Sequence, residues 1–166
     1  IGPHLKKGLK LVLTGTVVSR PYIEMTMAIM RAYGAVVDWA ECEDASACVV
    51  VEPVPYQSRP YQVESDWSAA SYWYEMVALA PNEDVEIVLP ALYANSLQGD
   101  SHGAQVFEQL GVQTRFVDGG VVLTKKGCCV SHLEYDFLEM PDLAQTFVVT
   151  CCMLGVSFHF KGLQSL

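Results

Sequence analysis

KLVLTG at residues 10–15 and SRPYIEMTMAIMRAYG at residues 19–34 together specify how this chain begins to fold. The first run is short, apolar and rich in strand-forming residues, which predicts a short buried strand. The second run predicts a helix, because Ser19 stands at a capping position, Pro21 lies in the first turn and Gly34 can end the helix. Two strand-like runs follow, at residues 35–39 and 47–52.

The same order of elements returns later in the chain. An apolar run at residues 85–90 precedes a helical run at residues 98–111 and two strand-like runs at residues 112–117 and 120–125. Gly34 and Gly111, the glycines expected to end the two helices, lie 77 positions apart. A recurrence at this spacing predicts one supersecondary unit used twice.

Each later unit also has an opening helix. Residues 65–80, capped by Asp66 or Ser68, precede the second unit, and residues 141–155 precede a final strand in the same way. The predicted fold class is therefore α/β (α+β), built from β-α-β-α-β-β units, with an incomplete set of them in this chain. If the units have this order of elements, the chain begins after the opening helix of one unit and stops inside another.

The stretch VEPVPYQSRPYQVE, residues 51–64, separates the two units. Proline disfavours both the interior of a helix and a central strand, and this stretch contains three prolines. It is therefore the best candidate for a linker. We expect a domain boundary near Tyr61, which gives one domain at residues 1–61 and a second at residues 62–166.

The charge balance limits the partners of this protein. Ten basic and nineteen acidic residues give a net charge of −9, and such a surface repels nucleic acids and anionic lipids. The uncharged run at residues 143–160 is long enough to span a membrane, but Gln145, Thr150 and His159 interrupt it. A buried helix that runs into a buried strand explains it better, so we expect neither a nucleic-acid nor a membrane partner.

The six cysteines show no C-x-x-C spacing, and four of them form two vicinal pairs. This pattern favours buried thiols in a reducing cytoplasm over a disulfide framework. From the amino-terminal sequence we expect no signal peptide. The four histidines lack metal-ligand spacing and no nucleotide-binding motif is present, so we expect neither a metal nor an organic cofactor.

Two places in the sequence could carry chemistry. Ser19, Arg20 and Tyr22 gather where a helix begins, and the amide groups there favour an anion such as phosphate. Asp142 follows Pro141 in the first turn of another helix, where a carboxylate could accept a proton or orient hydroxyl groups. Each place also has a purely structural interpretation: Ser19 caps, Arg20 is solvated, Tyr22 packs, and Asp142 only stabilises its helix end.

Another polar run, NSLQGD at residues 95–100, lies between a strand and a helix. Its simplest interpretation is a loop in which Asp100 or Ser101 caps the helix that follows.

Four stretches together resemble successive motifs of the 5-enolpyruvylshikimate-3-phosphate synthase family. They are SRPYIEMTMAIMRAYG, VESDWSAASYWY, NSLQGDSHGAQVFEQLG and EMPDLAQT, and they occur in the family's order and at its intervals. The resemblance implies the enolpyruvyl transferase fold, an inside-out α/β barrel with three repeat units in each of two domains. It places the crossover between domains near the sequence YQVESD.

The resemblance also implies an activity: transfer of the enolpyruvyl group of phosphoenolpyruvate to the 5-hydroxyl of shikimate 3-phosphate, without a metal or organic cofactor. Ser19 matches the serine that binds the substrate phosphate, and Tyr22 matches the tyrosine beside it. Asp142 matches the aspartate that engages the shikimate hydroxyls and accepts a proton. The chain then corresponds to the middle of a cytoplasmic enzyme and is expected to be inactive by itself.

Two alternatives remain open at this point. One is the related transferase that uses UDP-N-acetylglucosamine as the acceptor. The other is a non-catalytic module that packs or binds a ligand and is built from the same repeat.

Overall fold

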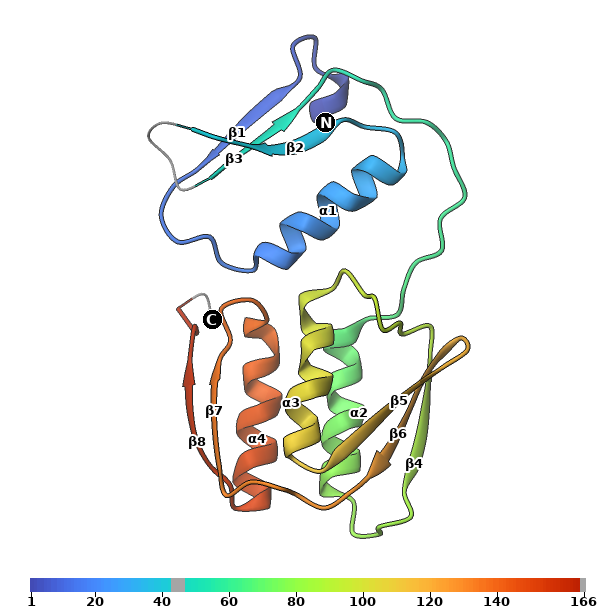
Figure 1. Cartoon of the computed structure of the whole chain (residues 1–166), viewed down its shortest axis with the longest axis vertical. Coiled ribbons are helices and arrows are strands. Elements are labelled where there is room, and N and C mark those ends of the chain that lie inside the picture. The colour runs from blue at the N-terminus through green and yellow to red at the C-terminus, as the bar shows by residue number, and fades with distance from the viewer. Residues whose placement is uncertain (43–46, 165–166) are drawn as a thin grey trace. The chain divides into compact units, whose positions relative to one another are not determined.

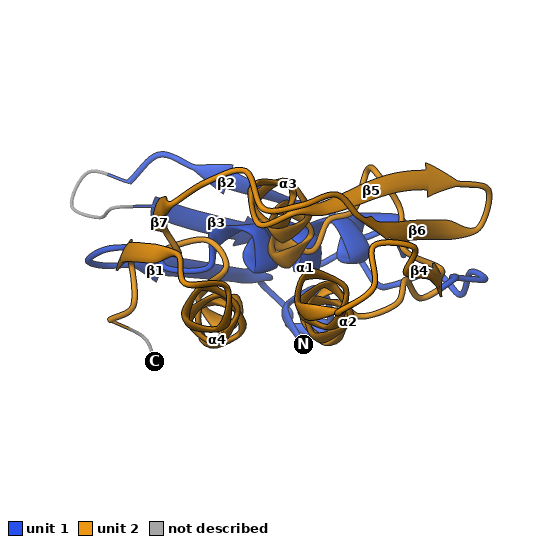
Figure 2. Ribbon diagram, turned by 90° about the horizontal axis from the view of Figure 1, so that it is seen from below, with its two compact units in different colours: residues 1–62 blue, residues 63–166 orange. Residues whose placement is uncertain are grey.

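The computed structural model describes residues 1–42 and 47–164. The chain divides into two compact units, residues 1–62 and 63–166, which Figure 2 shows in different colours. Each unit has its own sheet and its own hydrophobic core.

The first unit is a three-stranded antiparallel sheet with one α-helix (Figure 1). Strand β3 lies between β1 and β2 and pairs with both of them. A small core of Met27, Val37, Val49 and Val51 joins the helix to the sheet. The elements are a short 3-10 turn Gly2–His4, β1 Leu9–Leu13, α1 Arg20–Ala32, β2 Val37–Ala40 and β3 Ala47–Val51.

The second unit repeats this arrangement. Its strand β6 lies between β4 and β5 and is antiparallel to both, just as β3 lies between β1 and β2. Gly34 follows α1 with φ of 87°, and Gly111 follows α3 with φ of 91°. Both glycines take the left-handed conformation that ends a helix, so the predicted unit of strand, helix, strand and strand, used twice, is confirmed. The elements are α2 Trp67–Leu79, β4 Glu86–Pro90, η2 Gly99–His102, α3 Gly103–Gln109, β5 Val112–Val117 and β6 Gly120–Lys125.

A second, two-stranded sheet completes this unit. Strand β7, His132–Asp136, pairs in parallel with β8, Ser157–Lys161, and α4, Ala144–Leu154, connects them after the turn η3, Pro141–Leu143. The uncharged run at residues 143–160 is thus a helix followed by a strand, as predicted. Within the described ranges, no helix is long and apolar enough to cross a membrane.

Two predictions of burial were wrong. Strand β1 is exposed along most of its length, with Leu11 44% and Val12 55% exposed. It is an edge strand, and its alternate residues Leu9, Leu11 and Leu13 line a hollow rather than a filled core. Strand β8 alternates between exposed and half-buried positions, because the two-stranded sheet has one open face.

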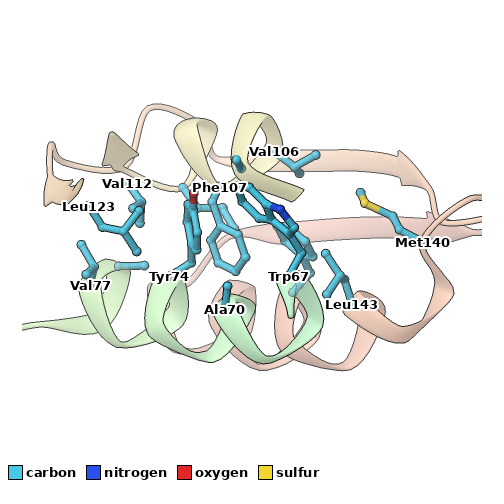
Figure 3. Close-up of a cluster of buried hydrophobic side chains, with 14 of the residues drawn as sticks. Trp67, Ala70, Tyr74, Val77, Val106, Phe107, Val112, Leu123, Met140 and Leu143 are labelled. Atoms are coloured by element: carbon cyan, nitrogen blue, oxygen red, sulfur yellow. The ribbon is translucent and has the colours of Figure 1, made fainter. Parts of the chain in front are cut away.

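The larger core fills the space between the helices and sheets of the second unit. The aromatic rings of Tyr74 and Phe107, which Figure 3 labels, lie 5.2 Å apart between ring centroids. The rings of Phe107 and Phe147 lie 4.3 Å apart by the same measure. These three aromatic side chains are nearly or fully buried, and Trp67 in the same core is 2% exposed. Each such side chain contributes about 1.5–3 kcal/mol by leaving water.

Residues 52–66, all of them described, form neither helix nor strand before α2 begins. The carboxylate of Asp66 accepts hydrogen bonds from the amides of Ser68 (2.8 Å) and Ala69 (3.2 Å). Of the two capping residues expected for α2, Asp66 is therefore the cap.

The expectation of buried thiols was wrong for most of the cysteines. Cys42 and Cys48 form a disulfide at the end of the β2–β3 hairpin, where their Cα atoms lie 6.1 Å apart, an ordinary spacing for such a bond. Antiparallel pairing places Cys48 opposite Ala40, two positions before Cys42, which sequence spacing did not reveal. Cys151 is buried and free, whereas Cys128, Cys129 and Cys152 are exposed.

Candidate functional site

Ser19 stands at the start of α1 in an unusual conformation. Its φ of 54° and ψ of 38° place it in the left-handed region, which serine seldom adopts. Ser19 occupies the predicted N-cap position of α1, but its side chain makes no capping hydrogen bond to the described chain. A residue whose side chain caps a helix typically has an extended backbone. Strain held at one polar residue is typical of a functional site.

Tyr22 lies one turn further along α1 and shares a hollow with Ser19. The amide of Tyr22 donates a hydrogen bond to the carbonyl oxygen of Ser19 at 3.0 Å. Both side chains line a cavity of about 690 Å³ between α1 and the sheet, whose other walls are mostly apolar side chains such as Leu13, Ile23 and Val49. Ser19 and Tyr22, predicted as a pair, thus face one space.

Arg20 is not simply solvated. Its guanidinium carbon lies 4.5 Å from the centre of the Trp39 ring, and its Nε atom lies 3.8 Å from Oε1 of Glu24. The same Glu24 oxygen accepts a hydrogen bond from Nε1 of Trp39 at 2.5 Å. This cluster was not found from the sequence, because Trp39 belongs to β2 and only the fold brings it to the start of α1.

Asp142 lies in the turn η3, directly before α4. Its neighbours Pro141 and Leu143 are buried, which fixes the turn, while the Asp142 side chain is exposed. The predicted position in a first helical turn after Pro141 is confirmed, although that turn is a 3-10 helix rather than part of α4. An exposed carboxylate on a well-anchored turn is able to meet a ligand.

The amino ends of the three helices of the second unit meet near this turn (Figure 1). Ser71 in α2 and Thr146 in α4 share a buried hydrogen bond of 3.2 Å between their hydroxyl groups. Ser68, at the start of α2, donates a hydrogen bond to the Asp100 carboxylate in η2. Because helix amino ends carry a partial positive charge, Asp142 lies where anions are favoured.

Asp100 does not cap the following helix, and that prediction was wrong. Asp100 is 1% exposed, and its carboxylate turns toward Ser68 in the interior. The residue at the capping position of η2 is Gln98, whose side chain makes no capping hydrogen bond among the described residues. Ser101 instead donates a hydrogen bond to the carbonyl oxygen of Gln98 at 2.7 Å.

Sequence reasoning also missed Glu64, which anchors the chain where the second unit begins. Its carboxylate accepts hydrogen bonds from Nε1 of Trp67 (2.9 Å), the amide of Tyr93 (3.0 Å) and the hydroxyl of Ser96 (2.6 Å). These bonds fix the loop at residues 91–98 against the start of α2. The only hint in the sequence is an acidic residue three positions before a tryptophan.

The candidate residues are divided between the units. Ser19 and Tyr22 belong to the first unit, and Asp142 belongs to the second. Among the described residues, no group of three or more histidine, cysteine, aspartate or glutamate side chains could hold a metal ion.

A family model described as EPSP synthase (3-phosphoshikimate 1-carboxyvinyltransferase) matches residues 1–166. The chain belongs to the EPSP synthase family. It is 53% identical over 166 residues to the 3-phosphoshikimate 1-carboxyvinyltransferase of Bacteroides fragilis (strain ATCC 25285), covering 100% of this chain and 39% of that protein. The enzyme of the same name from Idiomarina loihiensis is 35% identical over 146 residues, covering 87% of this chain and 32% of that protein.

The chain therefore spans about 39% of the length of the two Bacteroides fragilis relatives that it matches. A solved structure of EPSP synthase from Acinetobacter baumannii matches with 15% identity and a TM-score of 0.37, covering 99% of this chain and 39% of that one. A likeness this weak carries no argument. The family resemblance and the α/β fold class predicted from the sequence are confirmed by the family match.

Proposed function

We propose that the complete protein carrying this sequence is a 3-phosphoshikimate 1-carboxyvinyltransferase. It transfers the enolpyruvyl group of phosphoenolpyruvate to the 5-hydroxyl of shikimate 3-phosphate and releases inorganic phosphate. The observation that carries this proposal is the match of the whole chain to the EPSP synthase family, with relatives named for that activity. The exposed Asp142 at the amino ends of three helices supports it.

In this proposal Asp142 is the proton acceptor. The 5-hydroxyl oxygen adds to the central carbon of phosphoenolpyruvate while Asp142 takes the hydroxyl proton and the methylene carbon gains a proton. The resulting methyl group then loses a proton as the carbon–oxygen bond to phosphate breaks, which restores the double bond and releases phosphate. A positioned carboxylate accelerates such a step by about 10²–10⁴-fold. Its exposure and its rigid turn, between buried Pro141 and Leu143, suit this role.

Ser19 and Tyr22 are proposed to bind shikimate 3-phosphate. The Ser19 hydroxyl is not used for capping, so it is suited to donate a hydrogen bond to the substrate phosphate. Tyr22 lines the same hollow and is suited to contact the shikimate portion of the substrate. We also propose that residues 1–61 and 62–166 belong to two separate lobes of the enzyme.

The proposed reaction needs proton transfer and bond exchange but no change of oxidation state, so we propose no metal or organic cofactor. The proposed partners are the two anionic substrates, without nucleic acid or membrane, and the proposed place of action is the cytoplasm. The redox state of Cys42 and Cys48 in protein purified under anaerobic conditions tests that location, since a reducing compartment favours free thiols.

The proposed function is tested by mixing the complete protein with both substrates and measuring phosphate release. Release that requires shikimate 3-phosphate is the expected result. Release with UDP-N-acetylglucosamine in its place would assign the related transferase instead. Binding of shikimate 3-phosphate without any turnover would assign a non-catalytic module.

A further inference from the structure

Arg20, Glu24 and Trp39 form a closed cluster at the start of α1. The guanidinium of Arg20 lies over the Trp39 ring at 4.5 Å, within the range of a cation–π interaction. Trp39 Nε1 donates to Glu24 Oε1 at 2.5 Å, and that oxygen lies 3.8 Å from Arg20 Nε. Each of the three side chains thus restrains the other two.

We propose that Trp39 is a positioning residue, which holds Arg20 beside Ser19 so that the guanidinium meets the phosphate of the bound substrate. The inference rests on the proposed function, because the phosphate is that of shikimate 3-phosphate. Trp39 itself does not touch the substrate in this account.

The geometry leaves the two terminal nitrogens of the Arg20 guanidinium available to a ligand. The Cζ atom of Arg20 lies over the Trp39 ring, and Glu24 approaches through Nε. Among the described residues these are the contacts of the group, so its two terminal nitrogens remain for a ligand. Arginine binds phosphate through these nitrogens, with parallel hydrogen bonds in the plane of the group. The Arg20 side chain is 55% exposed, so a ligand can reach them.

Positioning matters because a free arginine side chain loses rotamer freedom when it binds an anion. The Trp39 ring restricts Arg20 before the substrate arrives, so less freedom is lost on binding. Strand β2 carries Trp39, and its pairing with β3 keeps the ring in place: Trp39 lies opposite Val49 in the sheet.

The test measures the steady-state kinetics of the complete enzyme. It uses the variants Trp39→Leu, Trp39→Phe and Arg20→Ala. Trp39→Leu removes both the ring face and the N–H donor, and it should raise KM for shikimate 3-phosphate about tenfold. KM for phosphoenolpyruvate and kcat should stay within about twofold, since neither depends on this contact. Trp39→Phe keeps a ring face for Arg20, so its KM should rise by less than about threefold.

The decisive comparison uses the Arg20→Ala background. If Trp39 acts through Arg20, Trp39→Leu should cause no further rise in KM once Arg20 is absent. An equal rise in both backgrounds would show that Trp39 only supports the fold, and would overturn the proposal. Trp73→Leu, which removes a 46% exposed tryptophan from α2, is the matched control and should leave KM unchanged.

Failure of the proposed function gives a different result. A wild-type enzyme that neither binds nor converts shikimate 3-phosphate would overturn both the function and this inference. A wild-type enzyme that converts it, with an unchanged KM in Trp39→Leu, would overturn only the positioning role. If Trp39→Leu unfolds, as judged by thermal denaturation, Trp39→Phe in the presence and absence of Arg20 gives the same comparison.

Discussion

The amide of Tyr22 donates a hydrogen bond to the carbonyl oxygen of Ser19 at 3.0 Å, while Ser19 itself has a φ of 54°. The bond closes the first turn of α1 over a residue in the left-handed conformation. Because the Ser19 side chain does not cap the helix, its hydroxyl contributes little to stability. The strain at this position is instead consistent with a role in binding.

Ser19 variants should separate stability from binding. Glycine adopts positive φ freely and alanine does not, so Ser19→Gly should be more stable than Ser19→Ala by about 1 kcal/mol in free energy of unfolding. Both variants lack the hydroxyl, so both should bind shikimate 3-phosphate more weakly than the wild type. Chemical denaturation and substrate titration of the complete protein measure the two effects. An alanine variant at least as stable as the glycine variant would contradict the strain at Ser19.

Gly103 should be sensitive to any added side chain. A Cβ atom there would lie 2.5 Å from Cδ1 of Leu143, which is 1% exposed and has little room to move. We expect Gly103→Ala to lower the free energy of unfolding by about 1–3 kcal/mol. Leu143 is the neighbour of Asp142, so kcat should also fall.

The exposed Gln105 on the same helix provides the control for Gly103. Gln105→Ala should change the free energy of unfolding by less than about 0.5 kcal/mol. Leu143→Ala should cost less in the Gly103→Ala background than in the wild type, because it removes the clash. Fully additive effects of the two substitutions would show that they do not meet.

The Cys151 thiol should resist alkylation. It should also make the free energy of unfolding depend on pH in the alkaline range. Burial raises the pKa of the Cys151 thiol from its ordinary value of 9.0 to about 11. The folded protein therefore keeps this proton at a pH where the unfolded chain loses it, so stability should fall as pH rises from 9 to 11. The decrease in the free energy of unfolding between pH 9 and pH 11 should be smaller in Cys151→Ala. At pH 8, iodoacetamide should modify Cys128, Cys129 and Cys152 but not Cys151, as read by mass spectrometry.

The 166-residue chain is expected to be inactive by itself. It spans about 39% of the length of the Bacteroides fragilis relative that it matches, and its net charge of −9 opposes the binding of two anionic substrates. A phosphate-release assay on the purified chain with both substrates should give no signal above background. Turnover by this chain alone would contradict the expectation.

Local signals in the sequence predicted the cap of α2 and the glycines that follow α1 and α3, but not the roles of Ser19 and Asp100. Asp66 was one of two expected caps of α2 and makes two hydrogen bonds to its amides. Gly34 and Gly111 end their helices with positive φ, as their spacing suggested. These features depend on a few neighbouring residues, so the sequence contains them directly.

Features that depend on distant partners were not predictable in this way. The exposure of Leu11 and Val12 depends on which strand lies at the edge of the sheet. Strand β7 was not predicted, because the run His132–Asp136 is short and polar. The contact of Arg20 with Trp39 joins a helix to a strand nineteen positions later. The pattern of side chains along the chain shows none of these arrangements before the fold is known.

The central claim is that Asp142 takes the proton from the acceptor hydroxyl. The most direct test is kcat of Asp142→Asn in the complete protein, at saturating concentrations of both substrates, together with the Kd for shikimate 3-phosphate. We predict that kcat falls by about 10²–10⁴-fold while shikimate 3-phosphate still binds. A kcat within a few-fold of the wild type would contradict the claim.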